Sequence, residues 1–237
     1  MSDYLEAIQK ILPAVAVVEE ETGNLGVEHL YPEEAELVVN AVDKRKHEFI
    51  AGRIAARRGL KQFALDDFPI LKGKHGEPLW PQGLVGSITH TADFRCCAVS
   101  SNEDLLSVGI DAEVIQTPDK ELLQLIALPD EIAWLKRQAT AEQTELFTLL
   151  FSAKEAFYKC QYPLTGRWLE FHDVSIDVVT KAAVMPGLLS VSVKDTGLNE
   201  IANGSKMVGR YIRAGDLLLS CFYVPTDTYL QQLASSS

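Results

Sequence analysis

The sequence from Leu105 to Glu113 reads LLSVGIDAE, an apolar run followed by two carboxylates that are separated by one residue. Its alternation of side chains predicts a β-strand over residues 105–114. Asp111 and Glu113 are two positions apart, so their carboxylates leave the same face of that strand. The strand can therefore present a pair of carboxylates at one place on its sheet.

A second segment, residues 151–156, reads FSAKEA and lies in a helical pattern. It supplies a third carboxylate, Glu155, with Lys154 and Lys159 close to it in sequence. Three convergent carboxylates suit a hard divalent cation such as Mg²⁺, which takes oxygen ligands and commonly binds a few carboxylates together with a substrate phosphate. The two segments together indicate phosphoryl-group chemistry.

The composition limits the classes of function. A chain of 237 residues fits one large domain or two smaller ones, and 47% apolar residues are enough for a core. A net charge of −11 argues against binding of nucleic acid, which depends on clustered Lys and Arg. Residues 43–61 are the exception, since their only acidic residues are Asp43 and Glu48. Their basic residues are Lys44, Arg45, Lys46, Arg53, Arg57, Arg58 and Lys61. This local basic patch predicts binding of a small, compact anion.

The cysteines and the N-terminus indicate a cytoplasmic protein. Cys96, Cys97, Cys160 and Cys221 form no CxxC pair, so buried free thiols in a reducing compartment are expected in place of a zinc site. The N-terminus lacks the basic region of a signal peptide. The apolar run at 14–18 is far shorter than the roughly 20 residues that span a bilayer.

The order of the expected elements predicts an α+β fold of two similar α/β halves. Strands are expected at 13–20, 84–90, 94–100, 105–114, 171–179, 188–194, 207–213 and 216–224, with turns at 92–93 and 214–215. Helices are expected at 32–62, 119–128, 130–138 and 142–161, the last ended by Pro163 and Gly166, with a loop at 66–81 and a frayed tail at 234–237. No sequence repeat identifies a duplication. The basic patch falls in a half at 1–105 and the carboxylates in a half at 106–237, so a site that uses both must lie at their interface.

Each feature taken alone has an ordinary explanation. Asp111 and Glu113 could face solvent. Glu155 and Lys159 have the i, i+4 spacing of a surface ion pair. His90 could be a polar residue at the end of a strand. Their joint occurrence, in this order, carries the functional hypothesis.

These motifs resemble those of the surfactin-type 4′-phosphopantetheinyl transferases. The matching segments are GSITHT at 86–91, GIDAE at 109–113 and FSAKEA at 151–156. EFIAGR at 48–53 and EPLWP at 77–81 are similar to the subgroup that includes enterobactin synthase component D. The resemblance covers about residues 40–175 and implies a pseudo-twofold fold with the active site between its halves.

Two positions depart from the family pattern. Phe151 stands where many members carry Trp, which is a conservative packing change. Ala112 stands where some relatives have a larger or polar side chain, so backbone or water would complete the metal's ligands between Asp111 and Glu113.

The resemblance implies an enzyme that moves the phosphopantetheine arm of coenzyme A to a serine of an apo carrier protein, releasing 3′,5′-ADP. Mg²⁺, or Mn²⁺ in its place, would be required. The implied partners are carrier domains of nonribosomal peptide, polyketide or fatty-acid synthases. The subgroup favours siderophore biosynthesis, as in an enterobactin synthase complex, or other secondary metabolism. Because one chain carries both sets of residues, a monomer is expected.

The resemblance also implies roles for individual residues at the nucleotide end of coenzyme A. Arg45, Arg53 and His90 would meet the 3′-phosphate and its ribose, since Arg makes bidentate contacts to phosphate oxygens. The residues implied for the adenine and phosphate region are Lys72, Gly73, Lys74, His75 and Thr89.

The catalytic roles fall on the second half. The implied metal ligands are Asp111, Glu113 and Glu155. Glu155, or a water it positions, would accept the proton of the serine. Lys159, helped by Lys154, would neutralise charge on the leaving 3′,5′-ADP, and Leu169 would touch the pantetheine arm.

Two other classes of function use part of this set. A non-catalytic module that binds coenzyme A or a carrier protein would keep the basic first half but would need neither the carboxylates nor Lys159. A Mg²⁺-dependent phosphatase or nuclease would use three carboxylates but leaves the basic patch and the Thr89-His90 motif unexplained. Transfer of a mass of one phosphopantetheine arm to a carrier domain would separate the enzyme from both.

Overall fold

The computed structural model describes residues 2–23, 25–91, 94–180, 186–194 and 207–235. The strands are β1 (Val17–Glu20), β2 (Leu84–Thr91), β3 (Phe94–Ser101), β4 (Leu105–Val114), β5 (Val174–Thr180), β6 (Gly187–Val193), β7 (Val208–Ala214) and β8 (Leu217–Pro225). The α-helices are α1 (Asp3–Ile11), α2 (Pro32–Glu36), α3 (Asp43–Lys61), α4 (Lys120–Ile126), α5 (Pro129–Lys136), α6 (Thr140–Thr165) and α8 (Asp227–Ser235). Two 3₁₀ turns, η1 (Val27–His29) and η2 (Phe171–Asp173), complete the described elements.

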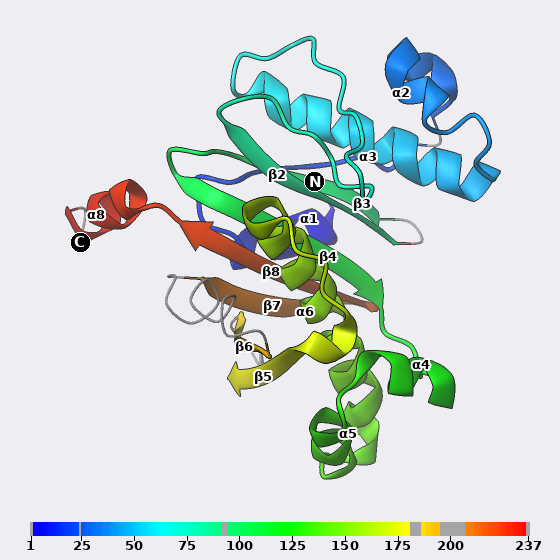
Figure 1. Cartoon of the computed structure of the whole chain (residues 1–237), viewed down its shortest axis with the longest axis vertical. Coiled ribbons are helices and arrows are strands. Elements are labelled where there is room, and N and C mark those ends of the chain that lie inside the picture. Colours follow the sequence, from blue (N-terminus) through cyan, green and yellow to red (C-terminus); the bar gives the residue numbers. More distant parts are fainter. Residues whose placement is uncertain (1, 24, 92–93, 181–185, 195–206, 236–237) are drawn as a thin grey trace.

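The strands form two antiparallel sheets, each covered by one long helix (Figure 1). The first has the order β1-β3-β2 and packs against α3, and the second has the order β4-β8-β7-β6-β5 and packs against α6. This arrangement is the α+β fold predicted from the sequence. No helix in the described part of the chain is long and apolar enough to cross a membrane.

The two sheets meet where β2 lies beside β4. Ser87 Oγ accepts a hydrogen bond from the Ile110 N–H at 3.0 Å, and Thr89 Oγ1 accepts one from the Ala112 N–H at 3.0 Å. Both residue numbers rise by two, so the strands run in the same direction. Side-chain hydroxyls thus satisfy backbone donors of β4 on the side away from β8, and they join the halves without a backbone ladder.

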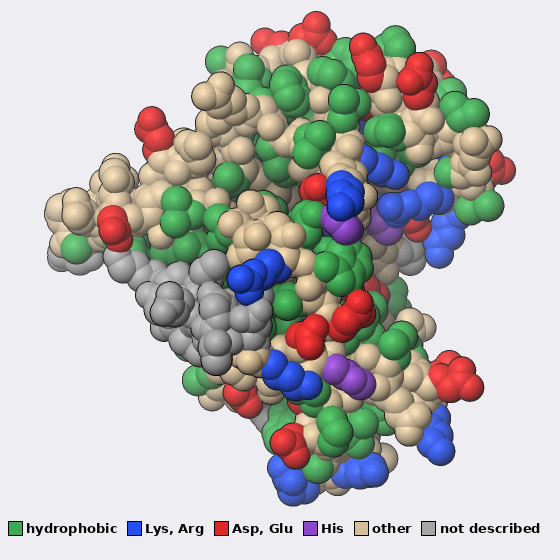
Figure 2. Space-filling view, viewed as in Figure 1, with side chains coloured by type: hydrophobic (Ala, Val, Ile, Leu, Met, Phe, Trp, Pro, Cys, Tyr) green, Lys and Arg blue, Asp and Glu red, His purple; other side chains and the backbone are tan. Residues whose placement is uncertain are grey.

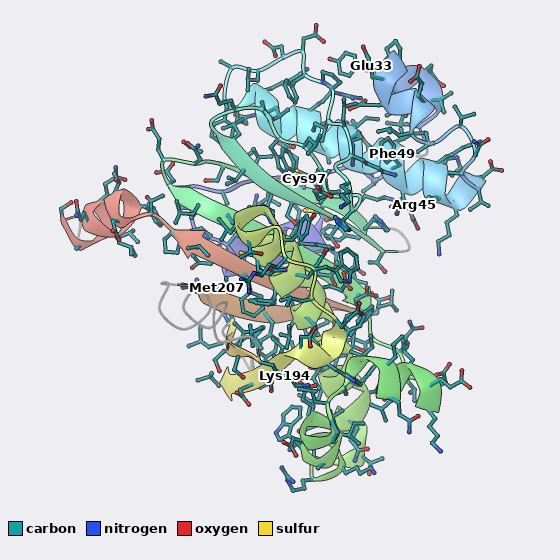
Figure 3. The ribbon with its side chains drawn as sticks, viewed as in Figure 1. Glu33, Arg45, Phe49, Cys97, Lys194 and Met207 are labelled. Atoms are coloured by element: carbon teal, nitrogen blue, oxygen red, sulfur yellow. The ribbon has the colours of Figure 1, made fainter. Side chains whose placement is uncertain are left out.

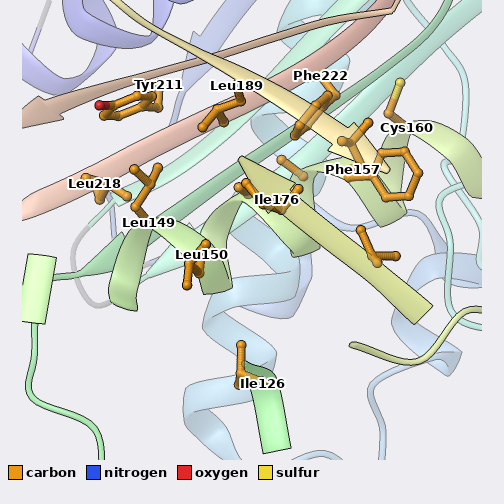
Figure 4. Packing of buried hydrophobic residues seen from close by; sticks show 14 of the residues in the cluster. Ile126, Leu149, Leu150, Phe157, Cys160, Ile176, Leu189, Tyr211, Leu218 and Phe222 are labelled. Carbon is orange, nitrogen blue, oxygen red and sulfur yellow. The ribbon is translucent and has the colours of Figure 1, made fainter. Parts of the chain in front are cut away.

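In the second half, α6 lies close to β4 because of Gly109. A Cβ at this glycine would lie 2.0 Å from the Ala156 carbonyl oxygen and 2.5 Å from the Cys160 nitrogen, both on α6. Behind this contact the apolar face of α6 packs into a large core, with Phe157 edge-on to Phe222 at 5.7 Å between ring centroids (Figure 4). The close approach brings the next turns of α6 over the carboxylates of β4.

In the first half, α3 packs its small residues on β3. Ala55 and Ala56 are fully buried in a cluster with Leu60, Cys97 and Val99. Small side chains on a helix let the backbone lie close to the sheet, so the longer basic side chains of α3 reach past it. All four cysteines are buried and free, as predicted.

The N-terminal helix α1 was not predicted, and it packs on the second half. Leu5, Ile8 and Ile11 are buried in a cluster that also holds Leu219 and Cys221 of β8. Helix α1 therefore shares a hydrophobic core with strands of the second half. The division of the chain at 105 stays a prediction about folding units.

Several boundaries differ from the sequence expectations. The helix expected at 32–62 is interrupted at 37–42, where Val38, Val39 and Val42 have low helix propensity. Helix α6 runs through Pro163 and ends at Gly166, which has φ 62°. The last hairpin turns at 215–216, one residue later than expected.

Other boundaries concern strands and the tail. The first strand is four residues long, not eight. Helix α8 continues to residue 235, so the tail is ordered further than expected. The expected strands at 84–90, 94–100, 105–114, 188–194, 207–213 and 216–224 are confirmed within one residue at each end. The strand expected at 171–179 begins three residues later, after η2. The expected turn at 92–93 lies outside the described residues.

Candidate active site

A cavity of about 350 Å³ lies between the two halves. Its lining comes from α3, the loop at 72–80, β2 and the C-terminal part of α6. Figure 2 shows Lys, Arg and His side chains gathered at the waist of the molecule, with acidic side chains just below them. The cavity therefore joins the basic patch of the first half to the carboxylates of the second.

The wall formed by α3 carries a buried guanidinium. Arg53 is 5% exposed, donates from Nε to the Ile70 carbonyl at 2.8 Å and lies 4.1 Å from the ring centroid of Phe49. Lys72 Nζ lies 4.8 Å from the same ring. Burial lowers the pKa of Arg53 to about 10, and the Glu34 carboxylate partly offsets this, so Arg53 stays charged at neutral pH. The aromatic ring between two cations makes this wall suited to an anion.

His90 lies at the mouth of this wall and is paired with Arg45. Arg45 Nη1 lies 2.8 Å from His90 Nε2, and because Arg can only donate, Nε2 accepts and the ring is neutral. Glu48 Oε2 is 3.6 Å from His90 Nδ1. Burial is the main cause that lowers the pKa of His90, with Glu48 opposing it. Figure 3 labels Arg45 and Phe49 on α3 in this region.

Beneath the cavity, Asp111 is held by residues from both halves. It is 3% exposed, and its Oδ1 accepts hydrogen bonds from Lys159 Nζ at 2.6 Å and from Thr89 Oγ1 at 3.3 Å. Lys159 Nζ also donates to the Ile110 carbonyl at 3.3 Å. The second oxygen, Asp111 Oδ2, is buried and has no hydrogen-bond partner within the described part of the chain. A buried carboxylate oxygen of this kind lacks an expected partner.

Glu113 and Glu155 are two further carboxyl groups that interact electrostatically with Asp111. The pKa of Glu113 is raised to about 8, mainly by burial and also by the Asp111 and Glu155 carboxylates, while Lys159 opposes them. Burial also raises the pKa of Glu155, with Asp111 adding to it. Burial acts to lower the pKa of Lys159, but the Asp111, Glu155 and Glu113 carboxylates together raise it above its ordinary value. With one ammonium for three carboxyl groups, the site favours the uptake of a proton or of another positive charge.

This set fits a divalent cation, although it is not closed around one. All its donors are carboxylate oxygens, the type Mg²⁺ prefers, and one of them is orphaned. Among the described residues, no three Asp, Glu, His or Cys side chains are gathered tightly enough to coordinate an ion as they stand. Lys159 occupies the other oxygen of Asp111.

A second, smaller cavity of about 190 Å³ lies on the other side of Glu155 and Tyr158, which line both. Its apolar lining includes Trp168, Leu169 and Phe171. Between the two cavities is an aromatic cluster in which His75 lies 5.4 Å from Tyr162 and 5.1 Å from Trp168. Tyr158 packs on both of these rings, at 5.5 Å and 5.1 Å between centroids.

The comparisons with known proteins identify this arrangement. Residues 33–100 match the model of the 4′-phosphopantetheinyl transferase N-terminal domain, and residues 107–191 match that of the 4′-phosphopantetheinyl transferase superfamily. The chain is 44% identical to 4′-phosphopantetheinyl transferase PptT of Mycobacterium tuberculosis, over 66% of this chain and 68% of that protein. It is 40% identical to 4′-phosphopantetheinyl transferase Svp of Streptomyces mobaraensis, over 78% of this chain and 76% of that protein. The chain belongs to the 4′-phosphopantetheinyl transferase family.

The transferase is also similar to enterobactin synthase component D of Salmonella typhi, with 34% identity over 49% of this chain and 48% of that protein. Among solved structures, holo-[acyl-carrier-protein] synthase of Helicobacter pylori in complex with coenzyme A matches with TM-score 0.35 and 16% identity, over 49% of this chain and 98% of that one. The family activity is transfer of the 4′-phosphopantetheine arm from coenzyme A to a carrier protein, as the sequence motifs predicted.

Most residues singled out in the transferase's sequence come together. Those that line the larger cavity are Arg45, Arg53, Lys72, His75, His90, Glu155 and Lys159. Asp111 lies directly beneath it, bonded to Lys159, and Glu113 lies two residues further along β4. Leu169 lines the second cavity. Their functional roles remain proposals.

Four residues lie elsewhere than predicted. Lys154 is 3% exposed, and its ammonium donates to Glu131, Ile126 and Phe171, so it is not free to neutralise a leaving group. Thr89 is 1% exposed, bonds Asp111 and β4, and does not line the larger cavity. Gly73 and the exposed Lys74 lie in the turn at 73–77 and do not line the cavity, although His75 of the same turn does.

Sequence reasoning missed several side chains of the transferase's site. Phe49 lies one turn before Arg53 on α3, a spacing that permits the cation–aromatic contact. Tyr158 and Tyr162 follow Glu155 at i+3 and i+7 on α6, on the same face. These helical spacings were the sequence signals that could have identified Phe49, Tyr158 and Tyr162 as residues of the site.

Proposed function

We propose that coenzyme A binds across the larger cavity with its nucleotide end on the α3 wall and its pyrophosphate above Asp111. One observation carries this proposal. Arg53 and His90 of the first half line the same cavity as Glu155 and Lys159 of the second. A ligand with a phosphate at one end and a reacting pyrophosphate at the other would meet a cation of the protein at each.

Glu155 would act as the base of the transfer. The serine oxygen of the carrier forms a bond to the β-phosphorus, the bond from that phosphorus to the bridging oxygen of the α-phosphate breaks, and the serine proton passes to the Glu155 carboxylate. Burial raises the pKa of Glu155, which makes it a better proton acceptor than an exposed carboxylate. Lys159, fixed by Asp111 at 2.6 Å, would neutralise charge on the departing 3′,5′-ADP.

Asp111, Glu113 and Glu155 would hold the divalent cation, Mg²⁺ or Mn²⁺. The ion would supply positive charge next to the pyrophosphate when it is bound. The orphaned Asp111 Oδ2 and the raised pKa of Glu113 support this assignment. The remaining roles stay with residues of the chain: the α3 wall binds the nucleotide, Glu155 takes the proton and Lys159 stabilises the leaving group.

The pantetheine arm would pass Tyr158 and lie in the second cavity. This cavity begins at Glu155, where transfer would occur, and its apolar lining of Trp168, Leu169 and Phe171 suits an arm with few charges. Carriers of nonribosomal peptide or polyketide synthesis, including those for siderophores, would be served, as the similarity to enterobactin synthase component D suggests. One chain would suffice, so sedimentation should give a mass near 26.2 kDa.

The experiment that tests this function is intact-mass spectrometry of an apo carrier domain incubated with the chain, coenzyme A and Mg²⁺. The expected result is a carrier that gains one phosphopantetheine arm, with 3′,5′-ADP as the second product. A carrier whose mass is unchanged, under conditions in which an established transferase modifies it, would contradict the proposal. Omission of coenzyme A is the matched control.

A further inference from the structure

The two halves share a short motif that packs the same way in each. Tyr31-Pro-Glu-Glu34 begins α2 in the first half, and Leu128-Pro-Asp-Glu131 begins α5 in the second. In both, proline is the first helical residue and glutamate the third. Both glutamates are buried, Glu34 with 0% and Glu131 with 5% of its surface exposed.

Glu34 accepts three hydrogen bonds, one from the start of its own helix, one from the long helix and one from a loop. It accepts from the Tyr31 N–H, at the start of its own helix, at 3.2 Å. It accepts from Arg57 Nη1, on the long helix α3, at 2.5 Å. Its other oxygen accepts from the Ile70 N–H, in the loop that leads to the cavity, at 2.8 Å.

Glu131 repeats these three bonds in the second half. It accepts from the Leu128 N–H at 2.8 Å, from Lys154 Nζ on the long helix α6 at 2.7 Å, and from the Ile176 N–H of β5 at 3.0 Å. Each glutamate therefore ties a short helix to the long helix of its half and to a distant backbone segment. A buried carboxylate held by this many donors has little freedom to move.

Each glutamate is linked to a wall of the site through one intervening residue. In the first half, Ile70 is held on both sides, since Glu34 binds its N–H and Arg53 Nε binds its carbonyl at 2.8 Å. Lys72, two residues further on, lines the larger cavity. Loss of the hydrogen bond from the Ile70 N–H to Glu34 would release the loop at Ile70. It would also release the Arg53 guanidinium, which donates to the Ile70 carbonyl.

In the second half, the partner of Glu131 is the residue before the proposed base. Lys154 also donates to the Phe171 carbonyl at 3.0 Å, and Phe171 lines the second cavity. This network fixes α6 at Glu155 and holds one wall of the second cavity against it.

We propose that Glu34 and Glu131 are equivalent positioning residues, one in each half: Glu34 sets the wall that binds the nucleotide end of coenzyme A, and Glu131, through Lys154, sets Glu155 and the wall of the second cavity. This inference rests on the proposed function of the two cavities. It explains why Lys154, adjacent to the proposed base, is buried in an ion pair.

Glu34→Gln and Glu131→Gln test it, because each keeps the shape of the side chain and removes its charge. The exposed neighbours provide matched controls, Glu33→Gln and Asp130→Asn; Figure 3 labels Glu33 on α2, at the edge of the molecule. The readouts are calorimetric affinity for 3′,5′-ADP, KM for coenzyme A and kcat. Glu34→Gln should weaken the binding of 3′,5′-ADP and raise the KM for coenzyme A, each by roughly tenfold, while kcat stays within about twofold. Glu131→Gln should lower kcat by roughly tenfold and leave 3′,5′-ADP within about twofold.

A Glu34→Gln variant that binds 3′,5′-ADP as the Glu33→Gln control does would overturn the inference. Equal loss of affinity and of kcat in both Gln variants would also overturn it, because it indicates a general structural role. If Glu34→Gln does not fold, Arg57→Lys keeps the charge beside Glu34 and gives the same test with the same predicted direction. Failure of the unaltered protein to bind 3′,5′-ADP would instead refute the proposed function, and this inference with it.

Discussion

Lys159 Nζ lies 2.6 Å from Asp111 Oδ1, and this ion pair joins the long helix of the second half to the strand at the seam between the halves. The approach depends on Gly109, two residues before Asp111, which leaves room for α6. The side chain of Lys159 is 28% exposed, whereas that of Asp111 is 5% exposed. Asp111 therefore holds the ammonium from below while Lys159 faces the cavity.

Asp111→Asn should lower kcat by about 10²-fold or more, because it removes a proposed metal ligand and the counter-ion of Lys159. Asn is nearly isosteric, so the fold should be retained in circular dichroism. Turnover is measured over a series of Mg²⁺ concentrations. Asp177→Asn, at an exposed position of β5, makes the same chemical change away from the site and should leave kcat unchanged. Near-normal turnover of Asp111→Asn at limiting Mg²⁺ would show that the assignment of the carboxylates is wrong.

Arg53→Ala should weaken the binding of coenzyme A by about 1.5–3 kcal/mol, the cost of losing a hydrogen bond to a charged group. Binding of 3′-dephospho-coenzyme A should change much less, and this comparison removes any effect of the lost Ile70 contact. Calorimetry of both ligands measures the difference. Lys61→Ala, at an exposed position near the end of the same helix, is the control. Equal weakening of the two ligands would exclude Arg53 as the partner of the 3′-phosphate.

Thr89→Val should reduce both stability and activity. Valine keeps the shape but leaves the Ala112 N–H of β4 without its acceptor and removes the donor to Asp111, so the free energy of unfolding should fall by about 1–3 kcal/mol. Ser87→Ala leaves the Ile110 N–H without its acceptor but does not touch Asp111. Urea denaturation should show a similar loss for both variants, and kcat should fall more in Thr89→Val. The reverse order of kcat would contradict a role of Thr89 in holding Asp111.

The buried thiols predict a loss of stability at alkaline pH. Burial raises the pKa of Cys160 to about 12, and burial also raises that of Cys96, Cys97 and Cys221 above the ordinary value of 9.0. Above pH 9 the unfolded chain loses thiol protons that the folded chain keeps. The contribution of the thiols to the free energy of unfolding is therefore complete below pH 9 and declines as the pH rises toward 12. Each thiol can contribute up to ~1.4 kcal/mol per pH unit. Urea denaturation between pH 8 and 10.5 measures the slope, and Cys160→Ala should make it shallower. An unchanged slope in this variant would refute the prediction.

The parts of the site that follow local patterns were predictable from sequence. The alternation in residues 105–114 placed Asp111 and Glu113 on one face of a strand, and the basic patch of 43–61 supplied Arg53 to the cavity. Each of these two predictions depends only on the sequence pattern of a single strand or helix. The break at 37–42 was missed because the run of acidic and apolar residues resembled a continuous helix, although three valines and Asn40 within it opposed one.

Partners from distant segments were not predictable. Lys154 and Glu155 are adjacent on α6, so their side chains diverge by about 100°, and of the two only Glu155 lines the larger cavity. Which one does so depends on Glu131, a residue of another helix whose burial the local sequence does not reveal. Helix α1 is a different case, because its local signals were present but were not used: Ser2 caps it, and Leu5, Ile8 and Ile11 recur at helical spacing.

A structure of the complex with coenzyme A and Mg²⁺ tests the central claim most directly. The account predicts that the 3′-phosphate lies within hydrogen-bond distance of Arg53 and His90 in the first half, and that the pyrophosphate lies beside Lys159 above Asp111 in the second. Coenzyme A bound entirely within one half, with its phosphates away from either group, would contradict it.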